Sequence, residues 1–258
     1  MVEKAGLKKF EVQQFAIGMK EIIEIPENII EERFNLASGE GAAHLFVGQC
    51  TGHIPGGGFI YTNKTSLSVG IVMYIDQLIE TKLEATEIMG EFNENPIVAQ
   101  LIQGGKLVEY SAHVIPEASR TELFTHGLLV VGDAAGLVIN NRITLRGMDM
   151  AIASGVAAAE TVKYAMEKID FSKKSLSHYE TLLKQDFVLR DMNTFKRSPQ
   201  FLKNARLYSF YPDLACGLFH RLNAVKGPKK RVINEILEET RGHKASMILD
   251  MIRGLRAL

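Results

Sequence analysis

Residues 127–162, GLLVVGDAAGLVINNRITLRGMDMAIASGVAAAETV, contain the side chains whose types and spacing could do chemistry. Gly132, Ala135 and Gly136 follow the apolar run GLLVV directly and have little or no side chain. Small residues at the carboxyl end of a strand in an α/β sheet let the backbone approach a ligand closely. Asp133 adds a carboxylate, which can accept hydrogen bonds from sugar-type hydroxyls. The turn could therefore contact a cofactor that carries such hydroxyls.

A helix is expected to begin at Gly147 and Met148, just after Arg146. Its first turn would offer unpaired backbone N–H groups and a positive dipole end, which suit a carbonyl or negative charge developing on a reduced ring. Small residues recur along one face of this helix at Ala151, Ser154, Gly155 and Ala158. A Gly-Asp turn alone is more often an ordinary turn, and a small-faced helix is more often simple packing. Their combination favours contact with a cofactor.

The elements before this segment predict an antiparallel sheet. Residues 11–25 mix apolar and polar residues in rough alternation, as a strand with one solvated face does. Apolar runs at 42–50, 58–62 and 66–75 are separated by turn-forming residues. The run KLVEYSAHVIP predicts a further strand, and GLLVV predicts a short, fully buried one.

Helices are expected between and after these strands. Pro26 can begin a short helix that ends near Phe34. Residues 76–102 predict two helices interrupted at Pro96, whose ring cannot continue the preceding turn. Apolar spacing predicts further helices near 148–166, 175–192, 205–222, 231–240 and 244–256.

We therefore predict an α/β fold combined with α+β, in three regions. Residues 1–120 would form an antiparallel-sheet domain with helices, on the substrate side. Residues 121–192 would contain the GDAAG strand and helix, and residues 193–258 a helical C-terminal region packed on the rest.

Composition and charge exclude several classes of protein. With 46% hydrophobic and 23% charged residues, the chain is typical of globular proteins. Lys+Arg and Asp+Glu both total 30, which gives no indication of nucleic-acid binding, although residues 184–258 have 15 basic and 7 acidic residues, a net charge of +8. Cys50 and Cys216 are too few for a disulfide framework or an iron–sulfur cluster, and the histidines lack metal-ligand spacing. We expect a cytoplasmic protein that is free or peripheral to a membrane, with no metal site.

The segment GDAAG, followed by RGMDMAIASG and AAAETV, resembles the second FAD fingerprint of the glutathione-reductase-like flavoproteins. It is most similar to FixC-like members of the electron transfer flavoprotein:quinone oxidoreductase family. GGGFIYTN, GGKLVEYSAHVIPEA and YPDLACGLF also look like blocks of that family, so the resemblance covers essentially the whole chain. It implies that residues 121–192 are part of a glutathione-reductase-like FAD domain and that residues 1–120 lie on the quinone side.

The resemblance also implies roles for individual residues. The position of Asp133 binds the ribityl and pyrophosphate region of FAD, within the turn formed by Gly132, Ala135 and Gly136. The helix start at Arg146, Gly147 and Met148 faces the isoalloxazine ring. Gly56 and Gly57 match a Gly-Gly pair that contacts quinone, where missing side chains would leave room for a flat ring. From the residues alone, PGGG favours a hairpin turn. No catalytic side chain is expected, because the flavin carries the chemistry.

The implied function is electron transfer from an electron transfer flavoprotein to quinone or to a ferredoxin-like partner. The Gly-x-Gly-x-x-Gly segment that binds the phosphates of FAD in this family has no counterpart here and would normally stand upstream. A non-catalytic fragment, or a split subunit that needs a separate FAD-binding half, is therefore an alternative. A geranylgeranyl reductase-like flavoenzyme is a weaker one, because its tryptophan motif cannot occur in a chain without Trp.

Two surface features leave alternatives open. The basic stretch at residues 226–231 suits a solvated surface or docking of an acidic electron carrier. The last helix has Ile248, Met251, Ile252 and Leu255 on one face, which suits either packing on its own domain or contact with a membrane surface.

Overall fold

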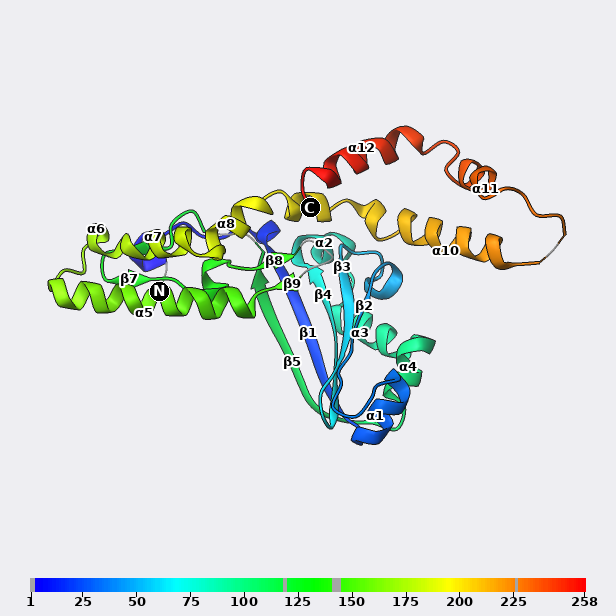
Figure 1. Cartoon of the computed structure of the whole chain (residues 1–258), viewed down its shortest axis with the longest axis horizontal. Coiled ribbons are helices and arrows are strands. Elements are labelled where there is room, and N and C mark those ends of the chain that lie inside the picture. Colours follow the sequence, from blue (N-terminus) through cyan, green and yellow to red (C-terminus); the bar gives the residue numbers. More distant parts are fainter. Residues whose placement is uncertain (1–2, 118–119, 141–144, 226) are drawn as a thin grey trace. The chain divides into compact units, whose positions relative to one another are not determined.

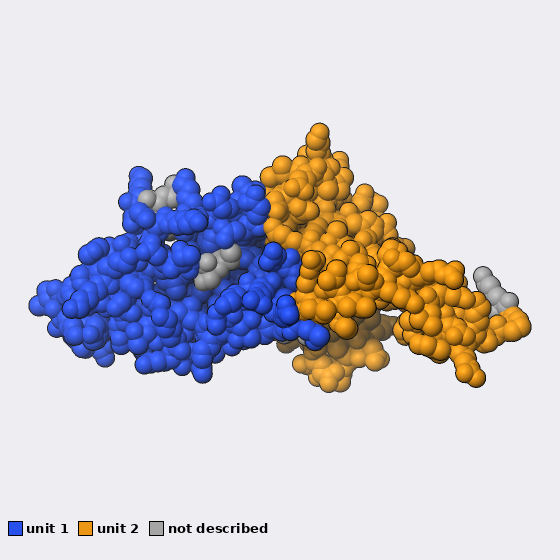
Figure 2. Space-filling model, turned by 90° about the horizontal axis from the view of Figure 1, so that it is seen from above, with its two compact units in different colours: residues 1–16, 114–202, 254–258 blue, residues 17–113, 203–253 orange. Residues whose placement is uncertain are grey.

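A computed structural model describes residues 3–117, 120–140, 145–225 and 227–258. The chain forms two compact units, which Figure 2 colours separately. Unit 1 comprises residues 1–16, 114–202 and 254–258, and unit 2 comprises residues 17–113 and 203–253. Each unit is described by itself below.

The sheet of unit 2 has five strands in the order β2-β3-β4-β1-β5 (Figure 1). The strands are β1 Phe15–Glu24, β2 Ala43–Phe46, β3 Gly56–Thr62, β4 Ser66–Tyr74 and β5 Lys106–Pro116. β3 pairs antiparallel with both neighbours, so that Gly58 lies opposite Phe46 on one side and Ile71 on the other. The antiparallel sheet predicted from the alternating runs is thus confirmed.

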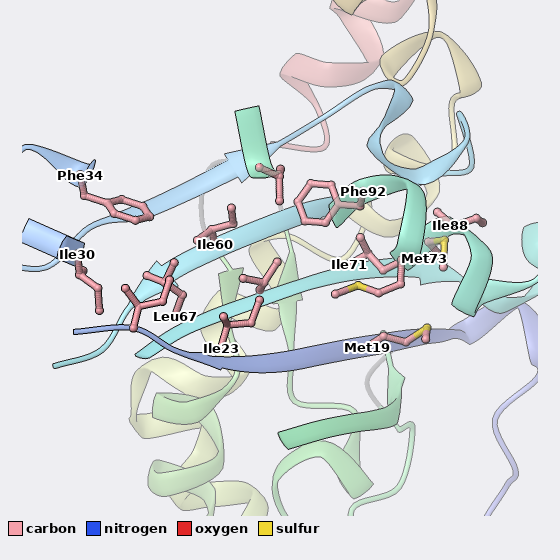
Figure 3. Close-up of a cluster of buried hydrophobic side chains, with 14 of the residues drawn as sticks. Met19, Ile23, Ile30, Phe34, Ile60, Leu67, Ile71, Met73, Ile88 and Phe92 are labelled. Carbon is pink, nitrogen blue, oxygen red and sulfur yellow. The ribbon is translucent and has the colours of Figure 1, made fainter. Parts of the chain in front are cut away.

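Four helices accompany this sheet: α1 Glu27–Phe34, α2 Ile75–Thr81, α3 Ala85–Glu94 and α4 Pro96–Ile102. Figure 3 shows Met19 and Ile23 of β1, Ile71 of β4 and Phe92 of α3 in the resulting core. A Cβ on Gly58 would lie 2.7 Å from the Phe92 ring, so only glycine lets that ring pack on β3.

Three helices, not the predicted two, occupy residues 75–102. Pro96 is the first residue of α4, and the Asn95 side chain accepts a hydrogen bond from the N–H of Ile97 at 3.1 Å. The additional break falls at Lys82, which ends α2 in the left-handed conformation with φ 57°. The apolar spacing continues across Lys82, so the spacing alone did not reveal this break.

The C-terminal part of unit 2 consists of the 3-10 turn Ala205–Leu207 and the helices α10 Phe210–Asn223, α11 Val232–Glu239 and α12 Lys244–Leu255. Asp250 of α12 is only 3% exposed and accepts two 2.7 Å hydrogen bonds from Arg206. The hydroxyl of Tyr211 donates a third, at 2.9 Å. These bonds attach α12, through the carboxylate of Asp250, to the 3-10 turn and to α10. None of the described helices combines the length and apolar character that crossing a bilayer requires.

Unit 1 is mainly helical. Two short strand pairs and a 3-10 turn precede its longest helix. The short elements are β6 Phe124–Thr125, β7 Leu128–Leu129, the 3-10 turn Gly132–Ala135, β8 Ile139–Asn140 and β9 Leu145–Arg146. The helices are α5 Met148–Lys168, α6 Lys173–Leu176, α7 His178–Gln185, α8 Phe187–Thr194 and α9 Ser198–Leu202. The helix predicted at 175–192 is interrupted, because Asp186 has extended backbone and caps α8 with its side chain.

The fully buried strand predicted for GLLVV is not observed. β7 has two residues, which pair antiparallel with β6, and both are only partly buried. Val130 is buried, but Val131 is 38% exposed. A strand with one short described neighbour cannot be covered as a strand inside a parallel sheet is. The mixed α/β fold with an antiparallel sheet is otherwise as predicted.

Candidate functional site

The GDAAG turn rests on the small-residue face of α5. Gly132 has φ 55°, and a Cβ on it would lie 3.3 Å from the Cβ of Ala151. The N–H of Gly132 donates to the hydroxyl of Ser154 at 3.0 Å, and that hydroxyl donates to the carbonyl of Ala151 at 2.9 Å. Gly136 ends the turn in the left-handed conformation, with φ 68°. The structure thus brings together the turn and the helix face that the sequence singled out.

Tyr179 of α7 supports the segment that leads into this turn, at Val130. Its side chain is fully buried, and its hydroxyl donates to the carbonyl of Val130 at 3.0 Å. Burial raises the pKa of Tyr179 to about 12, against the smaller lowering effect of a hydrogen bond with Ser154. The hydroxyl therefore stays protonated and acts as a fixed donor. Sequence reasoning missed Tyr179, because its only signal is a tyrosine on the apolar face of a helix.

Arg120 holds the other side of the turn. Its backbone N–H donates to the carbonyl of Ala135 at 3.0 Å, and its Nε donates to the carbonyl of Ala134 at 2.6 Å. Its guanidinium also donates to the carbonyl of Lys8 at 2.6 Å and lies 4.2 Å from the centre of the Phe10 ring. Partial burial lowers the pKa of Arg120 from its ordinary value. Arg120 orients two carbonyls of the turn, and nothing in the sequence around it predicted this contact.

The turn keeps one side accessible. Asp133 is partly buried, whereas Ala134 is exposed and Ala135 is fully buried. The peptide groups beside Asp133 can therefore be approached from outside, while Ala135 anchors the turn in the core. A turn that has small residues, one carboxylate and one accessible side fits a hydroxyl-bearing group such as the ribityl chain of FAD.

The start of α5 offers backbone donors. Gly147 is the N-cap residue and has no side chain with which to cap the helix. Met148 is 85% exposed. The first N–H groups of this 21-residue helix thus meet the requirement for binding a carbonyl or an anion.

The charge of Arg146 is already paired. Its Nε donates to Oδ2 of Asp149 at 2.6 Å, and its Nη1 donates to Oδ2 of Asp191 at 2.5 Å. The guanidinium also lies 4.9 Å from the centre of the Phe187 ring. Hydrogen bonds with Asp191 and Asp149 raise the pKa of Arg146. Arg146 therefore attaches the start of α5 to α8, and sequence reasoning missed Asp191 and Phe187 because they lie far along the chain.

Gly56 and Gly57 open strand β3 and do not form a hairpin turn. They pair with Met73 and Val72 of β4. A Cβ on Gly56 would lie 2.1 Å from the carbonyl oxygen of Val72, so this glycine is required by the close approach of β4. The missing side chain of Gly56 consequently leaves no room for a flat ring. Contact of these two residues with quinone stays a prediction, and Gly56 could take part only through its backbone.

In the described part of the chain, no group of three or more His, Cys, Asp or Glu residues could hold a metal ion. Cys50 is partly buried and Cys216 is exposed, and the two form no disulfide.

Solved structures define the class of fold. A geranylgeranyl bacteriochlorophyll reductase-like protein from Thermoplasma acidophilum superposes with a TM-score of 0.61 at 20% identity, over 97% of this chain and 58% of its own. The flavin-dependent halogenase CmlS superposes with a TM-score of 0.52 at 12% identity, over 98% of this chain and 48% of its own. The chain therefore has the fold found in these proteins.

Sequence comparison defines the family. Residues 15–115 match the family of ubiquinone-binding ETF-QO domains. Protein FixC of Escherichia coli K12 is 46% identical over 88% of this chain, and the probable electron transfer flavoprotein-quinone oxidoreductase YdiS of the same organism is 38% identical over 95%. Over most of its length the chain is therefore similar to FixC and to electron transfer flavoprotein-quinone oxidoreductases. The alignments cover 54% of FixC and 58% of YdiS, so the chain spans little more than half the length of these relatives.

Proposed function

We propose that this chain is the quinone-side half of a FAD-dependent oxidoreductase that passes electrons from an electron transfer flavoprotein to quinone or to a ferredoxin-like protein. The observation that supports it most strongly is the ubiquinone-binding family match over residues 15–115 in a chain that also has the GDAAG turn seated on α5. When bound, FAD would supply the redox chemistry, because flavins accept and donate both single electrons and hydride.

In this proposal, residues 121–192 are part of a glutathione-reductase-like FAD-binding domain. Gly132, Ala135 and Gly136 let the backbone approach the cofactor, and the carboxylate of Asp133 accepts hydrogen bonds from its hydroxyls. The seat formed by Ser154 keeps the turn in place for this contact, since it bonds the N–H of Gly132.

The start of α5 would face the isoalloxazine ring. The N–H groups that follow Gly147 and Met148 would stabilise negative charge on that ring through the helix dipole. Arg146 would contribute chiefly by position, since its guanidinium is bonded to Asp149 and Asp191.

The quinone would bind on the side of residues 1–120. Gly57 is the better of the two predicted contacts, because the space beside Gly56 is filled by the carbonyl of Val72. A quinone ring carries two carbonyl acceptors, so backbone N–H groups of neighbouring chain segments are suitable donors for it.

An acidic ferredoxin-like partner would be attracted by the positive C-terminal region. The stretch 226–231 is less available for this than its sequence suggests. Lys230 pairs with Glu238 at 2.7 Å, and Lys229 donates to the carbonyl of Arg221 at 3.0 Å. Lys226 lies outside the described residues. We therefore assign this partner to the positive region as a whole and not to that stretch.

A peripheral membrane contact is supported by α12. Ile248, Met251, Ile252 and Leu255 are 54%, 59%, 40% and 80% exposed. Arg253 is exposed beside them, as in helices that lie on anionic bilayers. Sedimentation with anionic vesicles tests this contact, and Ile252→Glu should reduce the bound fraction severalfold.

A split subunit that needs a separate FAD-binding half is the alternative proposal. The likeness to the geranylgeranyl reductase-like protein, at 20% identity, concerns the fold and gives no support to that activity.

Visible absorbance of the purified chain, before and after addition of FAD, tests the proposal. A yellow protein that bleaches with a reductant and is reoxidised by a soluble ubiquinone analogue would support the quinone-side function. A colourless chain that takes up no FAD, alone or with a polypeptide carrying the upstream segment of FixC, would contradict it.

A further inference from the structure

His53 lies in a tight turn directly before strand β3. The N–H of Ile54 donates to the carbonyl of Thr51 at 3.0 Å, which closes the turn around Gly52 and His53. Both of these central residues have left-handed backbone, with φ 59° at Gly52 and φ 63° at His53. Glycine suits this conformation, whereas histidine adopts it at a cost in free energy. The turn itself therefore gives no reason for a histidine at this position.

The backbone of His53 is also unusual within the described part of the chain. There, the residues other than glycine with left-handed backbone are Asn35, His53, Lys82 and Ile169. Asn35, Lys82 and Ile169 each end an α-helix, where this conformation is common. His53 ends no helix, because the preceding 3-10 turn already ends at Gly52. Backbone strain of this kind is concentrated at functional sites, which directs attention to the His53 side chain.

The imidazole of His53 is held in one orientation. Its Nδ1 lies 3.1 Å from the carbonyl oxygen of Tyr208, and Tyr208 itself is buried. A carbonyl oxygen only accepts hydrogen bonds, so Nδ1 carries the hydrogen. Nε2 is then the ring atom that can take up and release a second proton. The contact with Tyr208 persists in both protonation states, because Nδ1 is a donor in each.

The turn is fixed on its inner side. Thr51 is 0% exposed, and its hydroxyl donates to the carbonyl of Ile54 at 2.7 Å. Ile54 is part of the core of the sheet, and the carbonyl of Pro55 accepts a hydrogen bond from the N–H of Tyr74 at 3.1 Å. His53 is exposed to solvent. An acid or base on such a rigid support is already oriented before a substrate arrives.

The turn leads directly into the predicted quinone contact. Gly57 follows His53 by four positions, so the chain between them spans about 14 Å at most. Ile54 and Pro55 are buried, whereas His53, Gly56 and Gly57 retain accessible surface. One quinone can therefore contact the backbone of Gly57 and the ring of His53.

We propose that His53 is the acid that protonates the quinone. This inference rests on the proposed function, which places the quinone beside Gly57 and takes its electrons from reduced flavin. Conversion of a quinone to a quinol takes two electrons and one proton at each oxygen. At one oxygen, the Nε2–H bond of His53 breaks, an O–H bond forms, and the cationic ring becomes neutral. Solvent supplies the proton for the other oxygen and reprotonates His53, which is exposed.

A titration without flavin tests the contact. The purified chain, with 15N-labelled histidines, is titrated with a soluble ubiquinone analogue while the ring resonances are followed by NMR. The resonances of His53, assigned with the variant His53→Asn, should shift clearly more than those of His220, an exposed histidine of α10. Equal shifts at the two histidines, or no shift at His53, would overturn the inference.

Two variants separate proton transfer from support of the turn. His53→Gly relieves the backbone strain, and asparagine tolerates left-handed backbone, so neither His53→Gly nor His53→Asn should unfold at a lower temperature than the control His220→Asn. In the FAD-loaded protein, both should slow reduction of the ubiquinone analogue roughly tenfold or more. Reduction of ferricenium should stay unchanged, because ferricenium takes up an electron and no proton. Added imidazole should restore quinone reduction by His53→Gly, since it can occupy the vacated space.

The two acceptors also keep the two proposals distinct. A protein that reduces neither acceptor contradicts the flavin function, and the NMR titration then decides on His53. A protein that reduces ferricenium, and reduces quinone equally well with and without His53, contradicts the role of His53 alone. An equal loss with both acceptors would likewise overturn that role, because it would place the defect in electron transfer.

Discussion

Strand β4 of unit 2 and helix α5 of unit 1 are both rich in apolar residues, yet they are covered to very different extents. Along β4, Leu67, Val69, Ile71 and Met73 are all 0% exposed. Along α5, Met150 is 0% exposed while Ile152, two residues later, is 69% exposed. The chain itself supplies everything that packs on β4, but it covers only one face of α5. Strand β4 is thus covered by the described residues, whereas helix α5 has apolar side chains exposed on one face.

The same substitution in both elements tests this difference most strongly. Ile71→Ala would leave a cavity in a fully buried position and should lower the free energy of unfolding by about 2–5 kcal/mol. Ile152→Ala removes a side chain that already contacts water and should change the free energy by about 0.5 kcal/mol or less. Urea unfolding followed by circular dichroism measures both. Equal losses would mean that the outer face of α5 is packed within the isolated chain.

Low pH should weaken the ion pair between Arg206 and Asp250, which holds α12. The hydrogen bonds from Arg206, aided by Tyr211, hold the pKa of Asp250 at about 2, against an ordinary value of 3.8. Because the folded-state pKa is the lower one, this stabilisation is present above pH ~4 and is lost as the pH falls toward 2. The loss should amount to roughly 2 kcal/mol.

Urea unfolding at pH 5 and at pH 2.5 measures this loss, and Asp250→Asn provides the comparison. The variant should be less stable than the wild type at pH 5 and should lose less stability on acidification. An identical pH dependence in both proteins would show that Asp250 is not responsible. Since β4 is held by apolar contacts, signals from the sheet should change less with pH than those from α12.

The contact between α5 and the GDAAG turn should be weaker than the core of the sheet. Ser154→Ala leaves the buried N–H of Gly132 without its acceptor, which should cost roughly 1–2 kcal/mol. Thr194→Ala is the control, because its hydroxyl also bonds a carbonyl of the preceding helical turn but is exposed. Thermal unfolding should distinguish the two. If Ser154→Ala is as mild as Thr194→Ala, the turn does not depend on this hydroxyl.

Much of the fold could be predicted because its signals are local. The strands between residues 42 and 75 alternate in polarity and are separated by turn residues, and α5 shows small and apolar residues at helical spacing. The breaks at Lys82 and Asp186 could not be predicted in the same way, since the apolar spacing continues through both. Lys82 ends its helix in the left-handed conformation, and Asp186 caps the next helix with its side chain, and the apolar spacing indicates neither.

The segments of the candidate site could be predicted from the sequence, but the hydrogen bonds that hold them in place could not. The GDAAG turn and the small face of α5 could be recognised, but their support by Arg120 and Tyr179 involves side chains that are distant in sequence or masked by an apolar pattern. Gly56 illustrates a different limit. The missing side chain at this position suggested space for a ligand, but the carbonyl of Val72 occupies that space. A missing side chain in a sequence does not reveal what fills its place.

The smallest expected effect distinguishes Gly155, which lies in α5, from Gly132, which packs against α5 at Ala151. Gly155→Ala places a methyl group in open space on a helix and should raise the free energy of unfolding by about 0.5–1 kcal/mol, because alanine is the better helix former. Gly132→Ala should lower it by a similar amount, since φ is 55° there and the new Cβ would lie 3.3 Å from that of Ala151. Differential scanning calorimetry of both variants measures opposite shifts if the inner face of α5 is packed and the outer face is open. Destabilisation by Gly155→Ala would instead mean that the surface of α5 at Gly155 is already covered.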